Sequence, residues 1–256
     1  MPRVGLLFQT RASESPWIDS VWTCRSEQVA RMTSVASETW GLVFWQREGR
    51  AYAAVTGPES RTGTAPVPED ATFVGIQFAV GTSLRTVAAP FLVDSGIVLP
   101  DVTERGFWLD GARWETPHPD DAEALVARLV REGVVGRDPL VTAALRGEAT
   151  DVSDRTMERR FRAATGLTRG AVRQIARARA AAVLLSSGTA ESDVVTGLGY
   201  YDGPHLARAL RRYVGRTARQ LREGSGGALA LDPASVHHVV DEFGDPVGVA
   251  RGFAQA

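Results

Sequence analysis

Short runs of alternating apolar and polar residues occur in the first third of the chain. Residues 40–46 (WGLVFWQ), 51–56 (AYAAVT) and 72–78 (TFVGIQF) show the alternation that is typical of β-strands. The REGR sequence at 47–50 predicts a turn between the first two runs, and a Gly- and Pro-rich loop is expected over residues 57–70. Antiparallel strands folded on one another are therefore expected, as a β-sandwich or a cupin-like barrel.

The apolar spacing changes to that of helices from about residue 120 onward. Residues 120–132 (DDAEALVARLVRE) place Leu125 and Leu129 on one apolar stripe, which predicts a helix. Further helices are expected over residues 139–147, 153–164, 169–187, 191–198 and 203–214. Ser153 is a suitable N-cap, and Gly188 ends the longest of these helices.

These two patterns predict an α+β protein with two domains. A β-rich domain is expected over residues 1–137, followed by an all-α domain over residues 138–223. The GSGG sequence at 224–227 is typical of a flexible linker, and residues 224–256 are expected to form a linker and a tail without an assigned role.

Charge and aromatic content divide the chain in a similar way. Residues 151–223 hold 14 Arg and 7 acidic residues, a net charge of +7. The rest of the chain holds 15 Arg and 23 acidic residues, a net charge of −8. All six Trp lie between Trp17 and Trp114. A basic region of this size indicates an anionic partner such as nucleic acid.

Several classes of protein are excluded by what the sequence lacks. Cys24 is the only cysteine, so an internal disulfide and a cysteine-based zinc site cannot form, which suits a reducing compartment. The five-residue apolar run near the N-terminus is too short for a signal peptide or a membrane span, so a soluble cytoplasmic protein is expected. The adjacent His237 and His238 diverge on a helix or strand and make a poor metal-binding pair. No GxSxG motif is present, and neither catalysis, a metal nor a cofactor is expected.

The helical region contains the parts of a helix-turn-helix twice. Such a motif joins two helices by a short turn, and its second helix enters the major groove of DNA. Residues 139–147 pair with 153–164, and residues 191–198 pair with 203–214. The long helix between the pairs would hold two recognition helices roughly 34 Å apart, one turn of DNA, so that a single chain could span two half-sites.

Three runs in this region resemble the paired helix-turn-helix domain of the AraC/XylS transcription regulators. They are VSDRTMERRFRAATGLT, AVRQIARARAAAVLL and GLGYYDGPHLARALRRYVGRTARQLR, and the match covers residues 152–223. The resemblance implies a sequence-specific DNA-binding regulator with an N-terminal sensory domain. VGIQFAVGT is similar to a strand and turn in one branch of those sensory domains, although that branch usually has Arg and Pro in place of Gln77 and Val80.

The resemblance also assigns base-facing residues in each recognition helix. In the first helix they are Arg155, Glu158 and Arg159. Arg can bind guanine through two hydrogen bonds, and Glu can accept one from cytosine. In the second helix the base-facing positions hold Gly203, Pro204, Ala207 and Arg208. Only the last of these can read a base by hydrogen bonding, so the second helix is expected to clamp the DNA more than to read it.

Other basic side chains are expected to hold phosphates, which position a protein without reading sequence. In the second recognition helix they are His205, Arg211 and Arg212. The long connecting helix carries a further basic stripe, for which phosphate contact or interdomain pairing is predicted. Its residues, at i, i+4 and i+8, are Arg169, Arg173 and Arg177.

Some positions depart from the family pattern. Glu191 stands where the family usually has an apolar residue, and Val195 where it usually has Ala. In the first unit the connection from Leu145 to Ser153 is longer than the usual turn. A second hypothesis therefore stays open, in which the chain binds or sequesters a small molecule and its DNA-binding domain is degenerate.

The Trp-rich domain is the candidate site for an apolar or aromatic small-molecule effector. The predicted ligand-binding residues are Trp22, Trp40, Trp45 and Gln77, although aromatic residues in a β-domain also commonly form its core. Effector binding would be passed to the DNA-binding half through the helix over residues 120–132. Double-stranded DNA is the expected partner, an activator would also contact RNA polymerase, and a homodimer stays open.

Overall fold

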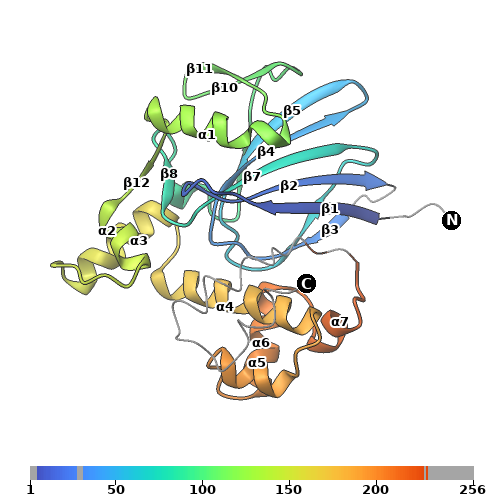
Figure 1. The fold of residues 1–256 in the computed structure, drawn as a ribbon, viewed down its shortest axis with the longest axis vertical. Helices are drawn as coiled ribbons and strands as arrows, with labels where there is room; N and C mark the ends of the chain where they lie inside the picture. Colours follow the sequence, from blue (N-terminus) through green and yellow to red (C-terminus); the bar gives the residue numbers. More distant parts are fainter. Residues whose placement is uncertain (1–4, 28–30, 228, 230–256) are drawn as a thin grey trace.

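The computed structural model describes residues 5–27, 31–227 and 229, which form a β-rich part and a helical part (Figure 1). Residues 5–115 contain the large sheet, and residues 119–222 contain the α-helices and one short strand. The predicted α+β class is confirmed. The domain boundary after residue 137 stays a prediction. Residues 230–256 of the tail, which include His237 and His238, lie outside the described residues.

Six antiparallel strands form the large sheet, in the order β1-β2-β7-β4-β5-β9. Their bounds are Gly5–Ala12 (β1), Ile18–Glu27 (β2), Gly41–Arg47 (β4), Arg50–Thr56 (β5), Thr72–Phe78 (β7) and Gly96–Val98 (β9). The strands expected from alternation are three of the four inner strands, β4, β5 and β7, and the predicted turn contains Glu48 and Gly49, both with positive φ. The sheet is open, with β1 and β9 at its edges, so it does not close into a barrel within the described residues.

The other described strands form three antiparallel pairs. They are β3 (Arg31–Ser34) with β6 (Gly63–Pro66), β8 (Thr82–Leu84) with β12 (Val135–Arg137), and β10 (Gly106–Leu109) with β11 (Ala112–Glu115). β6 lies inside the segment that the sequence predicts as a loop. The pairs are too small to make a sandwich with the large sheet, whose apolar face is covered by a helix instead.

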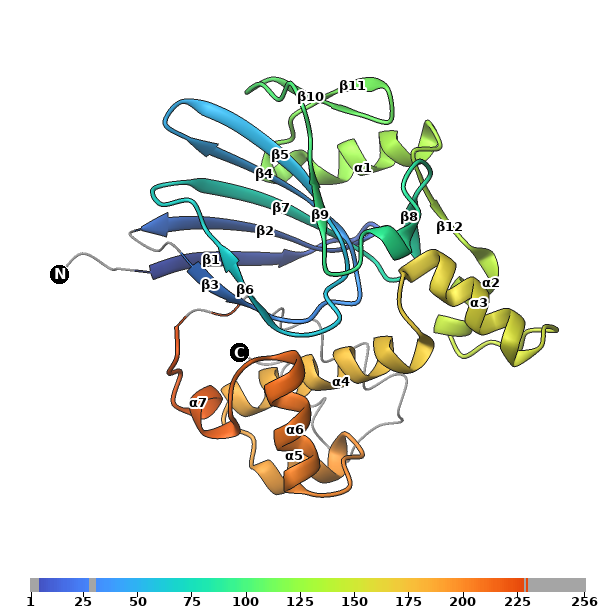
Figure 2. The ribbon, with the colours of Figure 1, turned by 180° about the vertical axis from the view of Figure 1, so that it is seen from behind.

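Helix α1 (Ala122–Arg131) lies across one face of the large sheet and follows the short 3-10 turn η2 (Pro119–Asp121) (Figure 2). Its Val126 and Leu129 are fully buried in one apolar cluster with Leu42 and Ile76 of the sheet. Alternate residues of a strand point to the same face, so apolar residues such as Leu42 and Ile76 gather on the part of this face that packs against α1. Each such side chain stabilises the fold by roughly 1.5–3 kcal/mol, so α1 is fixed firmly on the sheet.

All of the helices predicted after residue 138 are present, and one more follows them. Their bounds are Pro139–Leu145 (α2), Asp154–Thr165 (α3), Arg169–Ser186 (α4), Glu191–Gly197 (α5), Gly203–Tyr213 (α6) and Ala218–Arg222 (α7). The unpredicted α7 begins with a capping box between Thr217 and Gln220. Among the described residues, the helices lack the combination of length and apolar character that crossing a membrane requires.

An ion pair joins strand β1 to the first turn of α1. Arg11 donates to both carboxylate oxygens of Glu123, at 2.6 and 2.8 Å, and to the carbonyl oxygen of Pro119 at 2.6 Å. Ser13 Oγ donates to the same carboxylate at 2.7 Å. The hydrogen bond from Arg11 is the main reason that the pKa of Glu123 falls to about 2. The start of α1 is therefore held by charge as well as by its apolar side.

Replacement of Glu123 by Gln is expected to destabilise the fold at neutral pH by roughly 0.5–1 kcal/mol, a small value because the pair is partly exposed and screened by solvent. The depressed pKa means that Glu123 stabilises the folded state above its unfolded-state pKa of roughly 4.3 and loses this effect as the pH falls towards 2. Urea unfolding of both proteins between about pH 7 and pH 3 should show a difference that shrinks with acid. A difference that stays constant over this range would contradict the ion-pair assignment.

Candidate nucleic-acid interface

Two helix-turn-helix units lie along the connecting helix α4. The first consists of α2 and α3 at the N-terminal end of α4, and the second consists of α5 and α6 beside the rest of it (Figure 1, Figure 2). Val141 of α2 and Phe161 of α3 share one buried cluster, so the long connection after Leu145 does not separate these helices. Val194 of α5 and Leu206 of α6 share a second cluster. Each unit therefore has a packed core.

Both recognition helices begin with a side-chain cap, and Ser153 at the start of α3 is the cap that the sequence predicts. Ser153 Oγ accepts a hydrogen bond from the Thr156 N–H at 3.3 Å at the start of α3. Asp202 Oδ1 accepts one from the His205 N–H at 2.7 Å at the start of α6, where Pro204 occupies the first turn. Such caps satisfy N–H groups that have no partner in the helix, which gives both helices well-defined starts.

The exposed side of α3 carries the predicted base-facing residues. Arg155 and Arg159 are exposed, and no ion pair involves either of them in the described part of the chain. Glu158 is half-buried, and its Oε1 has no hydrogen-bond partner among the described residues. Arg162 is also exposed and follows Arg159 by three residues, so it lies on the same side of the helix. The spacing of these Arg residues could have identified Arg162, which the sequence analysis missed.

The two recognition helices correspond when they are aligned on their N-caps. Both have exposed Arg at the sixth and ninth positions after the cap, namely Arg159 and Arg162 in α3 and Arg208 and Arg211 in α6. At the second position α3 has Arg155 and α6 has Pro204. At the fifth position α3 has Glu158 and α6 has Ala207. The helices therefore share their later basic positions and differ in their first turns.

The turn before α6 places two aromatic side chains beside the helix. Tyr200 is buried, and Tyr201 is 90% exposed at the head of α6. The Tyr201 N–H donates to His205 Nδ1 at 3.3 Å, so a neutral His205 ring carries its proton on Nε2. Nε2–H is then the group that this side chain can offer to a phosphate. Arg212, the remaining predicted phosphate contact of α6, is exposed.

The basic stripe on α4 divides into side chains with different surroundings. Arg173 is exposed, and Arg169 is half-buried at the start of the helix. The Arg177 guanidinium lies 4.4 Å from the centre of the Tyr200 ring and donates to the Gly199 carbonyl at 3.3 Å. Burial is the main reason that the pKa of Tyr200 rises to about 12, and Arg177 opposes the rise. Arg177 thus holds the turn between α5 and α6, and phosphate contact by the stripe stays a prediction.

The departures from the family pattern fit into the second unit. Glu191 lies in the first turn of α5, 4.0 Å from Arg222, where a carboxylate is favoured by the helix dipole. A Cβ on Gly203 would lie 3.4 Å from Glu191 Oε1, so the starts of α5 and α6 approach closely. Val195 is half-buried and packs against the second cluster. Neither residue disrupts the packing of α5 against α6.

The predicted ligand-binding residues do not form one site. Trp40 is only 4% exposed, its ring stacks on Phe78 with centroids 3.8 Å apart, and its indole N–H donates to Thr82. Its assignment to a ligand site is therefore corrected: it is a core residue. Gln77 donates its amide to Thr39 and to the Trp40 carbonyl. Trp22 and Trp45 are half-buried on the face of the sheet away from α1, because their strand neighbours Val21 and Phe44 face the core.

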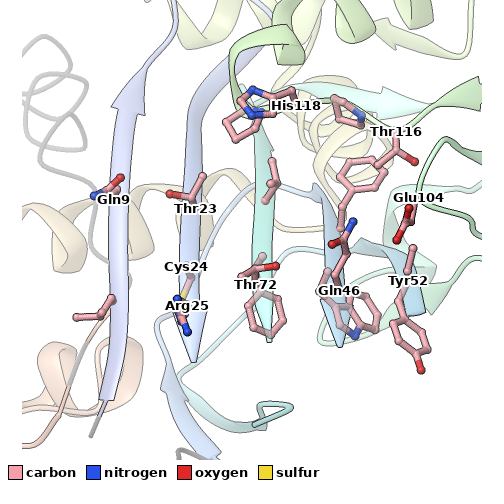
Figure 3. Close-up of a pocket in the computed structure, with 18 residues that line it drawn as sticks. Gln9, Thr23, Cys24, Arg25, Gln46, Tyr52, Thr72, Glu104, Thr116 and His118 are labelled. Atoms are coloured by element: carbon pink, nitrogen blue, oxygen red, sulfur yellow. The ribbon is translucent and has the colours of Figure 1, made fainter. Parts of the chain in front are cut away.

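A hollow of about 640 Å³ lies over the large sheet beside the start of α1 (Figure 3). Phe44 and Val74 belong to its floor, and residues 116–119 border it. Polar side chains from neighbouring strands also line it, among them Gln9, Thr23, Gln46 and Thr72. Trp45 also borders the hollow, but its strand neighbours Phe44 and Gln46 face the hollow, so the Trp45 ring lies on the other face of the sheet, stacked on Tyr52 and Phe73. The volume lies in the range of small-molecule sites, roughly 300–1,000 Å³.

Comparison with known families matches residues 147–224 to a helix-turn-helix domain. The match contains the five helices from α3 to α7, and hence both recognition helices. Searches of the curated proteins and of the solved structures gave no match to this chain.

Arg177 and Arg173 give a matched pair of variants on α4. Replacement of Arg177 by Ala is expected to destabilise the fold by roughly 1 kcal/mol, because the contact with the Tyr200 ring is lost. Replacement of the exposed Arg173 by Ala should change stability by less than about 0.5 kcal/mol. Thermal unfolding followed by circular dichroism measures both effects. Equal midpoints for the two variants would show that Arg177 does not stabilise the turn.

Proposed function

Because this chain is a DNA-binding transcription regulator with an AraC-type helix-turn-helix domain at residues 147–224, we propose that α3 reads the DNA sequence and that α6 clamps the backbone. The observation that supports this division is the difference between the two first turns. α3 presents Arg155 and Glu158, whereas α6 presents Pro204 and Ala207 at the same positions. An operator bound in this way has one half-site with strong base preferences and a second half-site bound mainly through phosphates.

Phosphate contacts are assigned to basic side chains at corresponding positions of the two recognition helices and to basic side chains beyond the first turn. In α6 they are Arg211, Arg212 and His205, with Arg208 at the edge of the bases. Arg162 is added in α3 because it corresponds to Arg211. Arg173 extends this basic surface onto α4. The net charge of +7 over residues 151–223 favours an encounter with DNA at any sequence, and the base contacts then select the site.

We further propose that the N-terminal domain binds an apolar or aromatic small molecule in the hollow beside α1. The apolar floor formed by Phe44 and Val74 would contact the body of such a ligand, and the hydroxyl and amide groups along the strands would orient it. The proposal uses neither the buried Trp40 nor the ring of Trp45, which lies on the other face of the sheet. Contact with RNA polymerase and a homodimer remain expectations, and DNA binding places the protein in the cytoplasm or nucleoid.

A continuous path leads from this hollow to the first helix-turn-helix unit. Residues 116–119 on its border lead directly into α1. α1 is followed by β12, and β12 by Asp138, whose carboxylate caps α2 through the Leu140 N–H at 2.9 Å. The other oxygen of Asp138 lies 3.0 Å from Arg160 of α3. A ligand that shifts the start of α1 would therefore bias the position of the first recognition helix, provided that it binds the two arrangements with different affinity.

The sequestering hypothesis differs from this proposal in one measurable respect. A protein that only stores a small molecule needs no coupling between the hollow and the helices. The main support for a degenerate DNA-binding domain is that Pro204 and Ala207 of α6 cannot form side-chain hydrogen bonds with bases. The packed cores of both units and the two formed N-caps support a working domain instead.

Replacement of Arg159 by Ala is expected to weaken binding to a selected operator by roughly 1–3 kcal/mol and to relax the preference at one base pair. Replacement of Arg211 by Ala should weaken binding to all DNA sequences by the same factor. It should also make the slope of the logarithm of affinity against the logarithm of salt concentration shallower by about one. Binding-site selection with the full chain, followed by titrations at several salt concentrations, separates the two effects. An Arg159 variant that selects the same motif as the wild type would contradict the assignment of α3 as the helix that reads the DNA sequence.

Ligand binding can be followed through tryptophan fluorescence of the full chain, because all six Trp lie between Trp17 and Trp114, in the β-rich part. A hit from a small-molecule panel should bind roughly tenfold more weakly after Val74 is replaced by Asp, since a buried charge on the apolar floor opposes an apolar ligand. A control variant, Thr142→Asp, carries the same new charge on α2, away from the hollow. The hit should also change operator affinity by more than about twofold, ~0.4 kcal/mol of coupling. A smaller change with intact binding would favour the sequestering hypothesis.

A further inference from the structure

A short segment of the N-terminal domain lies between the two helix-turn-helix units. This bridge segment, Thr33 to Glu38, begins with the last two residues of β3 and ends before β4. Val35 is buried in the apolar cluster of the second unit, with Leu206 and Leu210 of α6. The next residue, Ala36, is fully buried in the cluster of the first unit, with Phe161 of α3. Two consecutive residues of the β-rich part thus belong to two different cores of the helical part.

The bridge segment and its neighbour Thr62 close the C-terminal end of α6. The last carbonyl groups of a helix have no partner within it and must find one elsewhere. The Ala36 N–H donates to the Tyr213 carbonyl at 2.7 Å, and the Thr62 N–H donates to the Arg212 carbonyl at 2.9 Å. Thr62 Oγ1 in turn donates to the Ser34 carbonyl at 2.6 Å. The second recognition helix is therefore hydrogen-bonded at its end to the N-terminal domain.

Charge and close packing strengthen the same contact. Glu38 lies 3.5 Å from Arg179 of α4, and these side chains are only 11% and 9% exposed. Gly215, just after α6, has φ +72°, and a Cβ there would lie 2.7 Å from Thr62 Oγ1 and 2.9 Å from Thr33 Cγ2. A buried ion pair specifies one arrangement of its two elements, because separating the charges inside the protein is costly. The end of α6 can dock only when the bridge segment occupies this position.

The first unit is attached to a different part of the N-terminal domain. Val80 and Val93 pack against its cluster, and Gly166 at the end of α3 approaches Ala89 so closely that a Cβ would lie 2.8 Å from the Ala89 carbonyl. The sheet also holds the bridge segment, because Gln77 of β7 donates to Thr39 directly after it. Both recognition helices are thus anchored on one domain through separate contacts.

From these contacts we infer that the bridge segment is the element that sets the spacing of the two recognition helices on DNA. While it is docked, α3 and α6 bind two half-sites as one rigid pair, which raises the effective concentration of the second contact. When it is displaced, α6 is free to move on α4 and the advantage of binding both half-sites is lost. The inference rests on the proposed function, since it needs an operator with two half-sites.

The test compares full-length variants on three DNA duplexes. Gly215→Ala introduces the clash with Thr33 and Thr62, and Glu38→Gln removes the charge opposite Arg179 while it preserves the size of the side chain. Gly133→Ala is the matched control, because Gly133 has φ +71° and nothing lies within 4 Å of the added Cβ. The duplexes carry the selected operator, the operator with two base pairs inserted between its half-sites, and the half-site of α3 alone. The insertion moves the second half-site by about 7 Å and rotates it by about 70°.

The wild type and Gly133→Ala should lose roughly tenfold in affinity on the insertion. Gly215→Ala and Glu38→Gln should bind the operator roughly fivefold more weakly than the wild type does, while their affinity for the single half-site stays within about twofold of the wild-type affinity. The loss of affinity caused by the insertion, here called the insertion penalty, should be much smaller for these variants than for the wild type. If both variants keep the wild-type affinity and penalty, the inference is wrong. If they weaken the single half-site and the operator equally, the contacts only stabilise the fold and the inference is also wrong. A wild type that selects no sequence at all would instead overturn the proposed function.

Discussion

Burial of the connecting helix α4 on several sides is the constraint on which the helical part depends. Val172 and Ile175 belong to the first cluster, whereas Ala181 and Leu185 belong to the second, so one helix supplies both cores. Three consecutive alanines, residues 180–182, are fully buried where α6 and the bridge segment approach. Larger side chains there would push these elements apart. The short side chains of α4 thus allow the two recognition helices and part of the N-terminal domain to share one scaffold.

The sequence predicted the helices well because their signals are local. Caps such as Ser153 and Asp202 and glycines such as Gly188 mark helix ends within a few residues, and these ends are present in the structure. The strands were predicted only where alternation is strong. β1 was missed because it lies at the edge of the sheet, where exposed and half-buried positions are mixed. The open form of the sheet could not be predicted, because it depends on pairings between segments that are distant in the sequence.

The site was predictable in part for the same reason. The exposed Arg residues of α3 and α6 follow from helical periodicity, and Arg162 could have been added from it. The separate positions of Trp40, in the core, and of Trp45, on the opposite face of the sheet, could not be predicted, because they depend on which residues pack across the sheet. The same holds for Arg177, which joins α4 to the turn before α6: it lies over Tyr200 and donates to the carbonyl of Gly199, 22 residues later in the sequence. The contact of Ala36 with the end of α6 spans still more of the chain and has no local signal.

The place of Val35 and Ala36 has a consequence for how such a chain can change in evolution. Sensor and DNA-binding regions are often regarded as modules that can be exchanged by recombination at the linker between them. Here the helical region draws two core residues and two capping N–H groups from the N-terminal part of the chain. In a recombinant protein joined near residue 138, the helical region would lack a buried residue in each core, and the carbonyl groups at the end of α6 would have no hydrogen-bond donor. A new sensor could therefore be accommodated only if it brought an equivalent of residues 33–38, so the two regions are under selection as one unit.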